Sequence, residues 1–390
     1  MIIADCKRAW GVIAGALIAA LLGACALVDT VDPRYDTINR SAAKARNEGI
    51  LLNIVRASQN IPLNFITFSK VTGSGLMSTS AGLPDFGVGP PPLVSLVNRQ
   101  ALFSHNVLSG AARVDNTFDI TLLETKEFYN GLLGPVDLPT LNFFVRQGYS
   151  RELLFWLFTA SVRETIAGRT YEYRNDPDPA LACEQVRGRR RCFSDMVDVA
   201  LGTGLTVQTQ TQKAPASGKA EVLGRLCFDP VLAQQARRRY PADVFAQLLS
   251  ASGQRPRCTD AWPAVRNDGA TDLLTFEVLG TPVGVVRFEI TTRSTFGIYQ
   301  FLGRVIATGS MDRIRLRGHV DESEDPRLVA VGAAAAGGCF VDLFFESGYY
   351  CVPRQGAENT KRIFSLLAQL LALKTQPGDL AITPTFRAVQ

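Results

Sequence analysis

The chain has 390 residues, of which 46% are hydrophobic, and its formal net charge at pH 7 is +5. This length accommodates one large domain or two ordinary ones, and the apolar fraction is sufficient for a globular core. So small a net charge excludes a strongly basic chain, and it gives no support for a nucleic-acid partner or for any particular acidic partner.

The first residues have the pattern of an export signal. Lys7 and Arg8 precede an uncharged apolar run from Ala9 to Leu22, and small residues follow this run directly before Cys25. A charged start, an apolar stretch and small residues at the cut site are typical of a signal peptide. The segment Leu22–Cys25 also resembles the lipobox of bacterial lipoproteins, in which a leucine and two small residues precede a lipid-modified cysteine.

The lipobox resemblance implies a membrane-anchored mature protein. It implies removal of residues 1–24, a thioether-linked diacylglycerol on Cys25 and a further acyl chain, such as palmitate, on the new amino terminus. Two or more acyl chains give stable anchoring. Ala26 stands where an aspartate would retain a lipoprotein in the inner membrane of a Gram-negative cell, so we expect the outer membrane, with the protein facing the periplasm. An uncleaved transmembrane anchor over Ala9–Val28 and a plain secretory signal cut elsewhere are the alternatives.

The segments after the anchor alternate between helix and strand. Apolar residues at three- and four-residue spacing predict a helix from about Tyr35 to Ala57. Residues 62–72 look extended, whereas residues 73–100 are punctuated by glycine and proline and read as a long loop. From Arg113 to Leu122, polar and apolar residues alternate, which predicts a strand with one buried face.

Three helices are predicted next. Thr125 begins a helix through Leu133, and residues 138–147 and 151–167 form a helical hairpin with Ser150 as an N-cap. The second helix of this hairpin is apolar nearly all round. It is therefore expected to be buried, either in the core or against a partner.

The composition changes between residues 171 and 263. This segment holds four cysteines and two arginine triplets, Arg189–Arg191 and Arg237–Arg239. In an exported protein such triplets are interpreted as solvated faces or lipid-phosphate contacts rather than nucleic-acid sites. Residues 205–212 and 219–228 can pair as a polar hairpin, and we interpret the whole segment as an inserted, disulfide-bearing subdomain.

The last part of the chain again mixes both element types. Alternating residues predict a hairpin of 274–278 with 286–290, and Ser294 caps a following helix. Strands are predicted at 313–317 and within 340–352. A final helix with one apolar stripe spans Glu358 to Lys374, and the tail is extended.

Together these elements predict an α+β fold with a mixed or antiparallel sheet, packed helical hairpins and a disulfide-bearing insertion. The predicted organisation in chain order is a signal peptide at 1–24, a lipidated tether at 25–34, a first α+β half at 35–170, a Cys- and Arg-rich inserted subdomain at 171–263 and a second α+β half at 264–390.

Six cysteines besides Cys25 remain in the mature chain, and an even number in an oxidising compartment predicts disulfides. Six cysteines allow about 15 pairings, among which the sequence does not choose. Pairing of nearest neighbours has one difficulty, because a two-residue turn at Ser347-Gly348 would place Cys351 opposite Phe344 rather than near Cys339. The nearest-neighbour pairs are Cys183–Cys192, Cys227–Cys258 and Cys339–Cys351.

The sequence contains little recognisable catalytic machinery. It has no Gly-x-Ser-x-Gly, His-Glu-x-x-His or Walker motif. The two histidines, His105 and His319, are interpreted as structural or exposed, and without a Cys-x-x-Cys pair a zinc site is not expected. We predict no catalytic residue, cofactor or metal ligand. A weak alternative is an acidic group near Pro326 that could hydrolyse glycosides or pair with Arg293 and Arg304: Asp321, Glu322, Glu324 and Asp325.

Several segments resemble a family of uncharacterised proteobacterial envelope lipoproteins. They are Ile50–Arg56, residues 138–167, Arg293–Ile298 with Leu302-Gly303, and Leu366–Leu373. The resemblance follows the chain order over most of the mature sequence, and residues 171–263 depart from it. It implies an envelope location, and it assigns no site residues.

These observations leave three hypotheses for function. The first is a non-enzymatic envelope scaffold or assembly partner that binds other envelope proteins. The second is an oligomeric outer-membrane pore component, because segments 62–80 and 105–122 are long enough for a membrane-spanning hairpin, for which about 9–11 residues per strand suffice. The third is a lipid-anchored hydrolase of cell-wall or surface polysaccharide. Homo-oligomerisation is open in all three.

Overall fold

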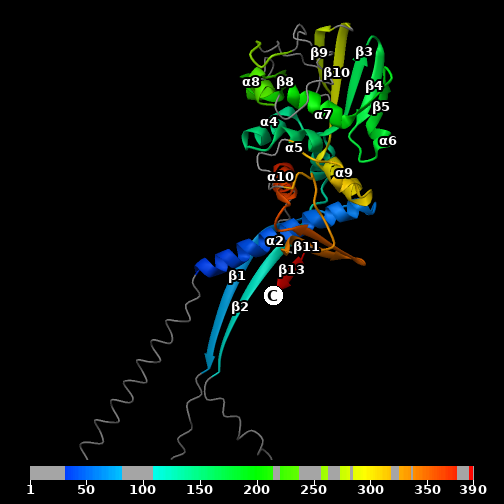
Figure 1. Cartoon of the computed structure of the whole chain (residues 1–390). Coiled ribbons are helices and arrows are strands. Elements are labelled where there is room, and N and C mark those ends of the chain that lie inside the picture. Colours follow the sequence, from blue (N-terminus) through cyan, green and yellow to red (C-terminus); the bar gives the residue numbers. More distant parts are fainter. Residues whose placement is uncertain are drawn as a thin grey trace, which may run out of the picture.

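The computed structural model describes residues 31–80, 109–213, 220–236, 256–261, 273–281, 284–317, 325–334, 337–375 and 386–389. The fold is α+β with antiparallel sheets, as the sequence predicts. Figure 1 shows a body of helices and short sheets above the long helix α2 (Val31–Ser58), and two long strands that run away from this body on the far side of α2.

The largest sheet of the body has four antiparallel strands in the order β4-β3-β10-β9. The strands are β3 (Thr159–Ile166), β4 (Arg169–Arg174), β9 (Leu273–Thr281) and β10 (Gly284–Thr292). Val162 lies opposite Ile290, and these two side chains are buried together with Phe288. The predicted hairpin of 274–278 with 286–290 is thus confirmed as β9–β10. Strand β3 pairs with β10 on the side away from β9.

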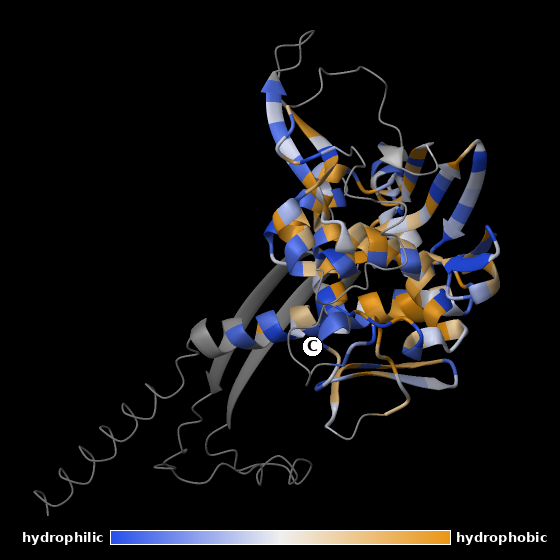
Figure 2. Ribbon diagram, turned by 45° about the horizontal axis from the view of Figure 1, so that its top comes forward, coloured by the Kyte–Doolittle hydropathy of each residue, from blue (hydrophilic) through white to orange (hydrophobic). Residues whose placement is uncertain are grey.

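Five helices enclose the core, and four of them begin at a polar cap. The four are α3 (Lys126–Leu133), α4 (Leu138–Arg146), α5 (Arg151–Phe158) and α9 (Thr295–Ala307), and the fifth is α10 (Glu358–Lys374), which follows Ala357. The hydroxyls of Thr125, Ser150 and Ser294 accept hydrogen bonds from backbone N–H groups three residues later, at 3.0–3.1 Å. The predicted caps Ser150 and Ser294 are confirmed, and Thr125, predicted as the start of its helix, is the N-cap of α3. Figure 2 shows the most hydrophobic ribbon on the helices at the centre of the body.

Helix α9 is the centre of this core and lies against α2. Its residues Ile298, Tyr299 and Phe301 have no exposed surface. At Gly303 the two helices approach so closely that an added Cβ would lie 2.6 Å from the backbone of Ala57. Only a glycine fits this crossing, which joins α2, the first helix described, to the body.

Residues 171–263 contribute to the same core as their neighbours. Their elements are α6 (Pro179–Ala182), β5 (Cys183–Val186), β6 (Arg189–Cys192), α7 (Phe193–Gly202), β7 (Leu205–Lys213), β8 (Ala220–Phe228) and α8 (Pro230–Ala236), and the predicted β7–β8 hairpin is confirmed. Phe193 and Met196 of α7 belong to the main hydrophobic cluster, as does Tyr173 of β4. The boundary at 171 falls within β4, and the division into halves and an insertion stays a prediction.

All three disulfides join nearest neighbours in the sequence. They are Cys183–Cys192, Cys227–Cys258 and Cys339–Cys351. The expected difficulty at the last pair disappears because the turn is at Glu346-Ser347, one residue earlier than assumed, with Glu346 at φ 51°. Cys351 therefore lies opposite Asp342. A bulge between Cys339 and Val341 brings Cys339 closer to Cys351 along the strand, and the Cα atoms of the two cysteines are 5.5 Å apart.

Three predicted elements differ in the structure. The helix predicted over 151–167 ends at Phe158, and the chain continues as β3, because the buried side chain of Arg293 and the amide of Asn175 bind the last carbonyl groups of α5. Residues 73–80 extend a strand instead of opening a loop. Residues 313–317 form no strand and contribute one isolated bridge, between Arg315 and Arg327.

Candidate functional site

The long hairpin is the most distinctive feature of the described chain. Strand β1 (Ile66–Ser80, 15 residues) pairs with β2 (Ser109–Leu122, 14 residues) in one antiparallel register with a single irregularity between Phe68 and Lys70. At about 3.3 Å per residue the strands are roughly 45 Å long. Figure 1 shows them leaving the body beyond α2.

The register of the hairpin places most of its large apolar residues on one face and most of its polar residues on the other, with Asn116 and Leu76 as exceptions. Residues that face each other across an antiparallel pair belong to one face, and successive residues belong to opposite faces. One face has the pairs Ile66/Leu122, Phe68/Ile120, Val71/Phe118, Gly73/Asn116, Gly75/Val114 and Met77/Ala112. The other face has Thr67/Thr121, Lys70/Asp119, Thr72/Thr117, Ser74/Asp115, Leu76/Arg113 and Ser78/Ala111. The alternation predicted for 113–122 therefore extends over both strands.

Buried residues fix the base of the hairpin to α2 and α9. The Asn53 side chain of α2 forms two hydrogen bonds with the backbone of Asn64, at 2.8 and 2.9 Å. Phe65 is buried, and its ring packs against Phe128 and Tyr299 at centroid distances of 5.7 and 5.5 Å. The direction in which the hairpin leaves the body is thus set by the core.

The extended tail closes one edge of the hairpin near its base. Strand β13 (Phe386–Val389) pairs with β2, with Phe386 opposite Ile120 and Val389 opposite Thr117. The sheet order is β1-β2-β13, so β1 is an edge strand in the part of the chain described. Beyond Thr117 the outer edge of β2 is also without a described partner.

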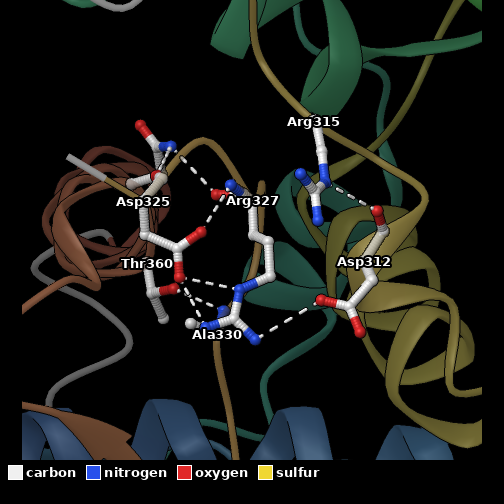
Figure 3. A network of polar contacts seen from close by, with 7 residues as sticks. Asp312, Arg315, Asp325, Arg327, Ala330 and Thr360 are labelled. Carbon is white, nitrogen blue, oxygen red and sulfur yellow. Dashed lines mark hydrogen bonds and ion pairs between the residues drawn. The ribbon is translucent and has the colours of Figure 1, made fainter. Parts of the chain in front are cut away.

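The residues singled out for chemistry are mostly outside the described segments. These are Cys25, His105, His319, Asp321, Glu322 and Glu324. Asp325 is described, and Figure 3 shows it beside Arg327, whose backbone N–H and Nε bind the two carboxylate oxygens at 2.9 and 2.7 Å. Burial by itself would raise the pKa of Asp325, but the hydrogen bonds and charge of Arg327 hold it below its ordinary value.

The same network connects Asp325 to its surroundings. Arg327 also reaches Asp312, 3.6 Å away, and Thr360 of α10 accepts a hydrogen bond from the backbone N–H of Ala330. These contacts tie residues 325–330 to α10 and to the 3-10 turn Ser310–Asp312 that follows α9. Asp325 therefore has a structural ion pair, and the predicted pairing of such acids with Arg293 and Arg304 is not seen for it.

Arg293 and Arg304 have other partners. Arg304 pairs with Asp176 at 2.5 Å. Arg293 is 7% exposed and donates to the carbonyl groups of Trp156, Leu157 and Asn175, while its guanidinium lies 4.0 Å from the Phe301 ring centroid. Burial lowers the pKa of Arg293 to about 9, and the charge of Arg304 adds to the effect.

A buried ion pair attaches the β5–β6 hairpin to the main sheet. Glu164 of β3 is fully buried and accepts two hydrogen bonds from Arg191, at 2.7 and 3.3 Å, and one from the Tyr173 hydroxyl at 2.8 Å. Burial, and then the charge of Glu164, raise the pKa of Tyr173. The expectation that the 189–191 triplet is a solvated face is wrong for Arg191, while residues 237–239 lie outside the described segments.

A partly buried carboxylate on α7 makes stability depend on pH. Asp198 pairs with Arg317 at 2.6 Å, yet burial raises the pKa of Asp198 to about 6 from 3.8, with Asp195 and Glu152 adding to the rise. The native state therefore binds this proton more tightly than the unfolded state, and stability falls as the pH rises from about 4 to about 6. We expect Asp198→Asn to flatten this decline in a series of melting temperatures at different pH. An unchanged slope would contradict the assignment.

The body also contains an apolar cavity of about 560 Å³, its open mouth included. It lies between α4, α5, α7, the β7–β8 hairpin and β10, and Leu141, Phe155, Leu205 and Val207 are among its lining residues. Its walls are almost wholly apolar, and Arg151, at its rim, donates a hydrogen bond to the carbonyl of Leu205. The cavity could admit a small apolar group.

Three further findings bear on the class of site. Within the described segments no three His, Cys, Asp or Glu side chains come together as a metal-binding group. None of the helices described is both long and apolar enough to cross a bilayer. Comparisons with models of known protein families, with curated proteins and with solved structures gave no match.

Proposed function

We propose that this protein is an outer-membrane-anchored lipoprotein that assembles into an oligomeric pore, with β1–β2 as the segment that enters the bilayer. The observation that carries the proposal is the length and register of this hairpin. Its strands of 15 and 14 residues exceed the roughly 9–11 residues that a tilted strand needs to cross the hydrocarbon layer. Alternation of apolar and polar pairs suits a strand with lipid on one face and water on the other.

The hairpin edges that no described strand covers favour an oligomer. A two-stranded hairpin is at best marginally stable in water, and each unsatisfied backbone group costs several kcal/mol in a bilayer. The edge strand β1 and the outer half of β2 therefore need partner strands. Hairpins of neighbouring copies are the simplest source of these partners, since every copy supplies both edges.

The proposed lipid anchor agrees with this arrangement. Only five residues separate Cys25 from Val31, the first residue of α2, so the six residue steps between them span at most about 20 Å. Lipid on Cys25 would hold the start of α2 near the bilayer. Because α2 also holds the base of the hairpin through Asn53, one helix would connect both membrane attachments.

The scaffold hypothesis loses one of its three motivations. It rested on the anchor, on the lack of catalytic motifs and on the strongly apolar segment 151–167, whose helical part is α5. Leu153, Leu157 and Phe158 of α5 are buried in the protein's own core, so this helix offers no apolar face to a partner. The hydrolase hypothesis gains no support from Asp325, which has its ion pair with Arg327.

A pair of adjacent substitutions tests the pore. Val114 belongs to the apolar register and Asp115 to the polar one. An arginine facing lipid costs about 2–4 kcal/mol per copy near the midplane, so we expect V114R to reduce channel insertion by about tenfold or more in planar bilayers. D115R should insert like the parent protein and shift ion selectivity towards anions. Absence of conductance from the lipidated parent protein, or equal insertion of both variants, would refute the proposal.

A further inference from the structure

Exposed aromatic side chains gather on a second hairpin, formed by β11 (Cys339–Phe345) and β12 (Gly348–Pro353). Phe344 is 69% exposed and lies opposite Tyr349, which is 41% exposed, whereas Phe340 on the same hairpin packs its ring against Phe364 of α10, at a centroid distance of 6.4 Å. Large apolar side chains that cluster on a surface usually mark a contact with a partner or a membrane. The exposed rings of Phe344 and Tyr349 do not contribute to the hydrophobic core of the body.

The opposite face of this hairpin already has a partner. The Gln59 side chain at the end of α2 donates to the Tyr350 hydroxyl at 3.3 Å, and the guanidinium of Arg56 lies 6.0 Å from the Phe345 ring centroid. Val341 and Val352 are buried on the body. Phe344 and Tyr349 are therefore held on the outside, and the Cys339–Cys351 disulfide restricts rotation of the two strands.

Figure 1 shows β11–β12 on the same side of α2 as β1 and β2, away from the main sheet of the body. The carboxyl-terminal end of α2 makes both contacts: Asn53 holds the segment before β1, and Arg56 and Gln59, about one turn further on, contact β11–β12. If β1–β2 crosses a bilayer, β11–β12 lies where the surface of that bilayer is expected.

We infer that the outer face of β11–β12 rests in the headgroup layer of the membrane that β1–β2 enters, an inference that depends on the proposed function. Aromatic side chains concentrate at the interfaces of membrane proteins, where a ring contacts acyl chains and a hydroxyl stays in polar surroundings. Tyr349 has this arrangement, because its hydroxyl donates to Asp342 at 3.0 Å on the same face. The carboxylate of Asp342 limits the depth to the headgroups, since a charge is costly in the hydrocarbon layer.

Tryptophan fluorescence of the full lipidated protein in phosphatidylcholine vesicles tests this inference. The variant is F344W, and the matched control is F143W, because Phe143 of α4 is 41% exposed and lies on the body, on the other side of α2. Emission of the parent protein, which contains other tryptophans, is subtracted. We expect the added emission of F344W to shift to shorter wavelength on reconstitution and to be quenched by phospholipids brominated near the top of the acyl chains, while F143W changes in neither respect.

Each other outcome overturns the inference. Emission of F344W that stays at the wavelength of a water-exposed indole places the hairpin in solvent. A shift without quenching by brominated lipid places it against another protein chain. Conductance is measured on the same vesicles, so loss of the pore and loss of the interfacial contact are distinguishable. Thermal unfolding of F344W should match the parent, because Phe344 is mostly exposed.

Discussion

Glu164→Ala is expected to lower the free energy of unfolding by about 3–5 kcal/mol, because it removes one member of a buried ion pair. The carboxylate has no exposed surface, and Arg191 is only 7% exposed. Without Glu164 the guanidinium loses a partner at 2.7 Å, and the Tyr173 hydroxyl loses its acceptor. Chemical denaturation with the disulfides intact measures the change.

A neighbouring exposed pair provides the matched control. Glu172 on β4 lies 3.6 Å from Arg174, with side chains 39% and 59% exposed. Exposed pairs contribute about 0–1 kcal/mol, so Glu172→Ala should change stability little. Replacing both Glu164 and Arg191 by methionine should recover much of the loss, because a buried pair can be exchanged for apolar side chains at small cost. Equal losses for E164A and E172A would contradict a buried charge pair.

Gly303→Ala is expected to destabilise the protein by about 1–3 kcal/mol, the usual cost of overpacking a core. The new Cβ would lie 2.6 Å from the backbone of Ala57 and from the backbone nitrogen of Ser58. Backbone atoms cannot rotate away as a side chain can, so α2 and α9 must separate. Since α2 also holds the base of β1–β2, the variant should show faster proteolysis at the hairpin base as well as a lower melting temperature.

Gly49 in the same helix α2 gives the opposite expectation. An added Cβ there meets no atom within 4 Å. Alanine is favoured over glycine inside a helix by roughly 0.5–1 kcal/mol, so Gly49→Ala should stabilise the protein by about that amount. If Gly303→Ala and Gly49→Ala change the free energy of unfolding in the same direction, the close contact of Gly303 with Ala57 does not determine the effect of Gly303→Ala.

Elements with local signals were predictable from the sequence. The caps Thr125, Ser150 and Ser294 lie directly before helices, and the last helix has the predicted bounds, Glu358–Lys374. The three hairpins of residues 205–228, 274–290 and 340–352 follow from alternation on either side of a turn. In each case the residues whose interactions determine the element lie close together in the sequence.

The segment 151–167 shows why other elements were missed. Its apolar run is compatible with a helix throughout, and neither glycine nor proline marks the change at Thr159. The helix ends where Arg293 and Asn175, remote in sequence, bind its last carbonyl groups. Likewise the glycines at 73 and 75 suggested a loop, whereas pairing with Asn116 and Val114 keeps this stretch extended. Tertiary pairing overrides local preference at both places.

The candidate site was only partly predictable. Two extended segments long enough for a membrane hairpin are visible in the sequence, because their alternation is local. The pairing of β1 with β2, which creates an apolar and a polar face, is not visible in the sequence, because 28 residues, 81–108, separate the two strands. The exposed face of Phe344 and Tyr349 gave no signal either, because the sequence does not reveal which side of β11–β12 contacts α2.

The order of the three disulfides has a consequence for maturation. Every bond joins a cysteine to the next one along the chain, at separations of 9, 31 and 12 residues. A polypeptide that enters an oxidising compartment amino terminus first can therefore close each bond before the next pair emerges, so simple stepwise oxidation yields the native set without reshuffling. Cys25 would be the odd thiol ahead of them, and the proposed acylation would block it before any mispairing.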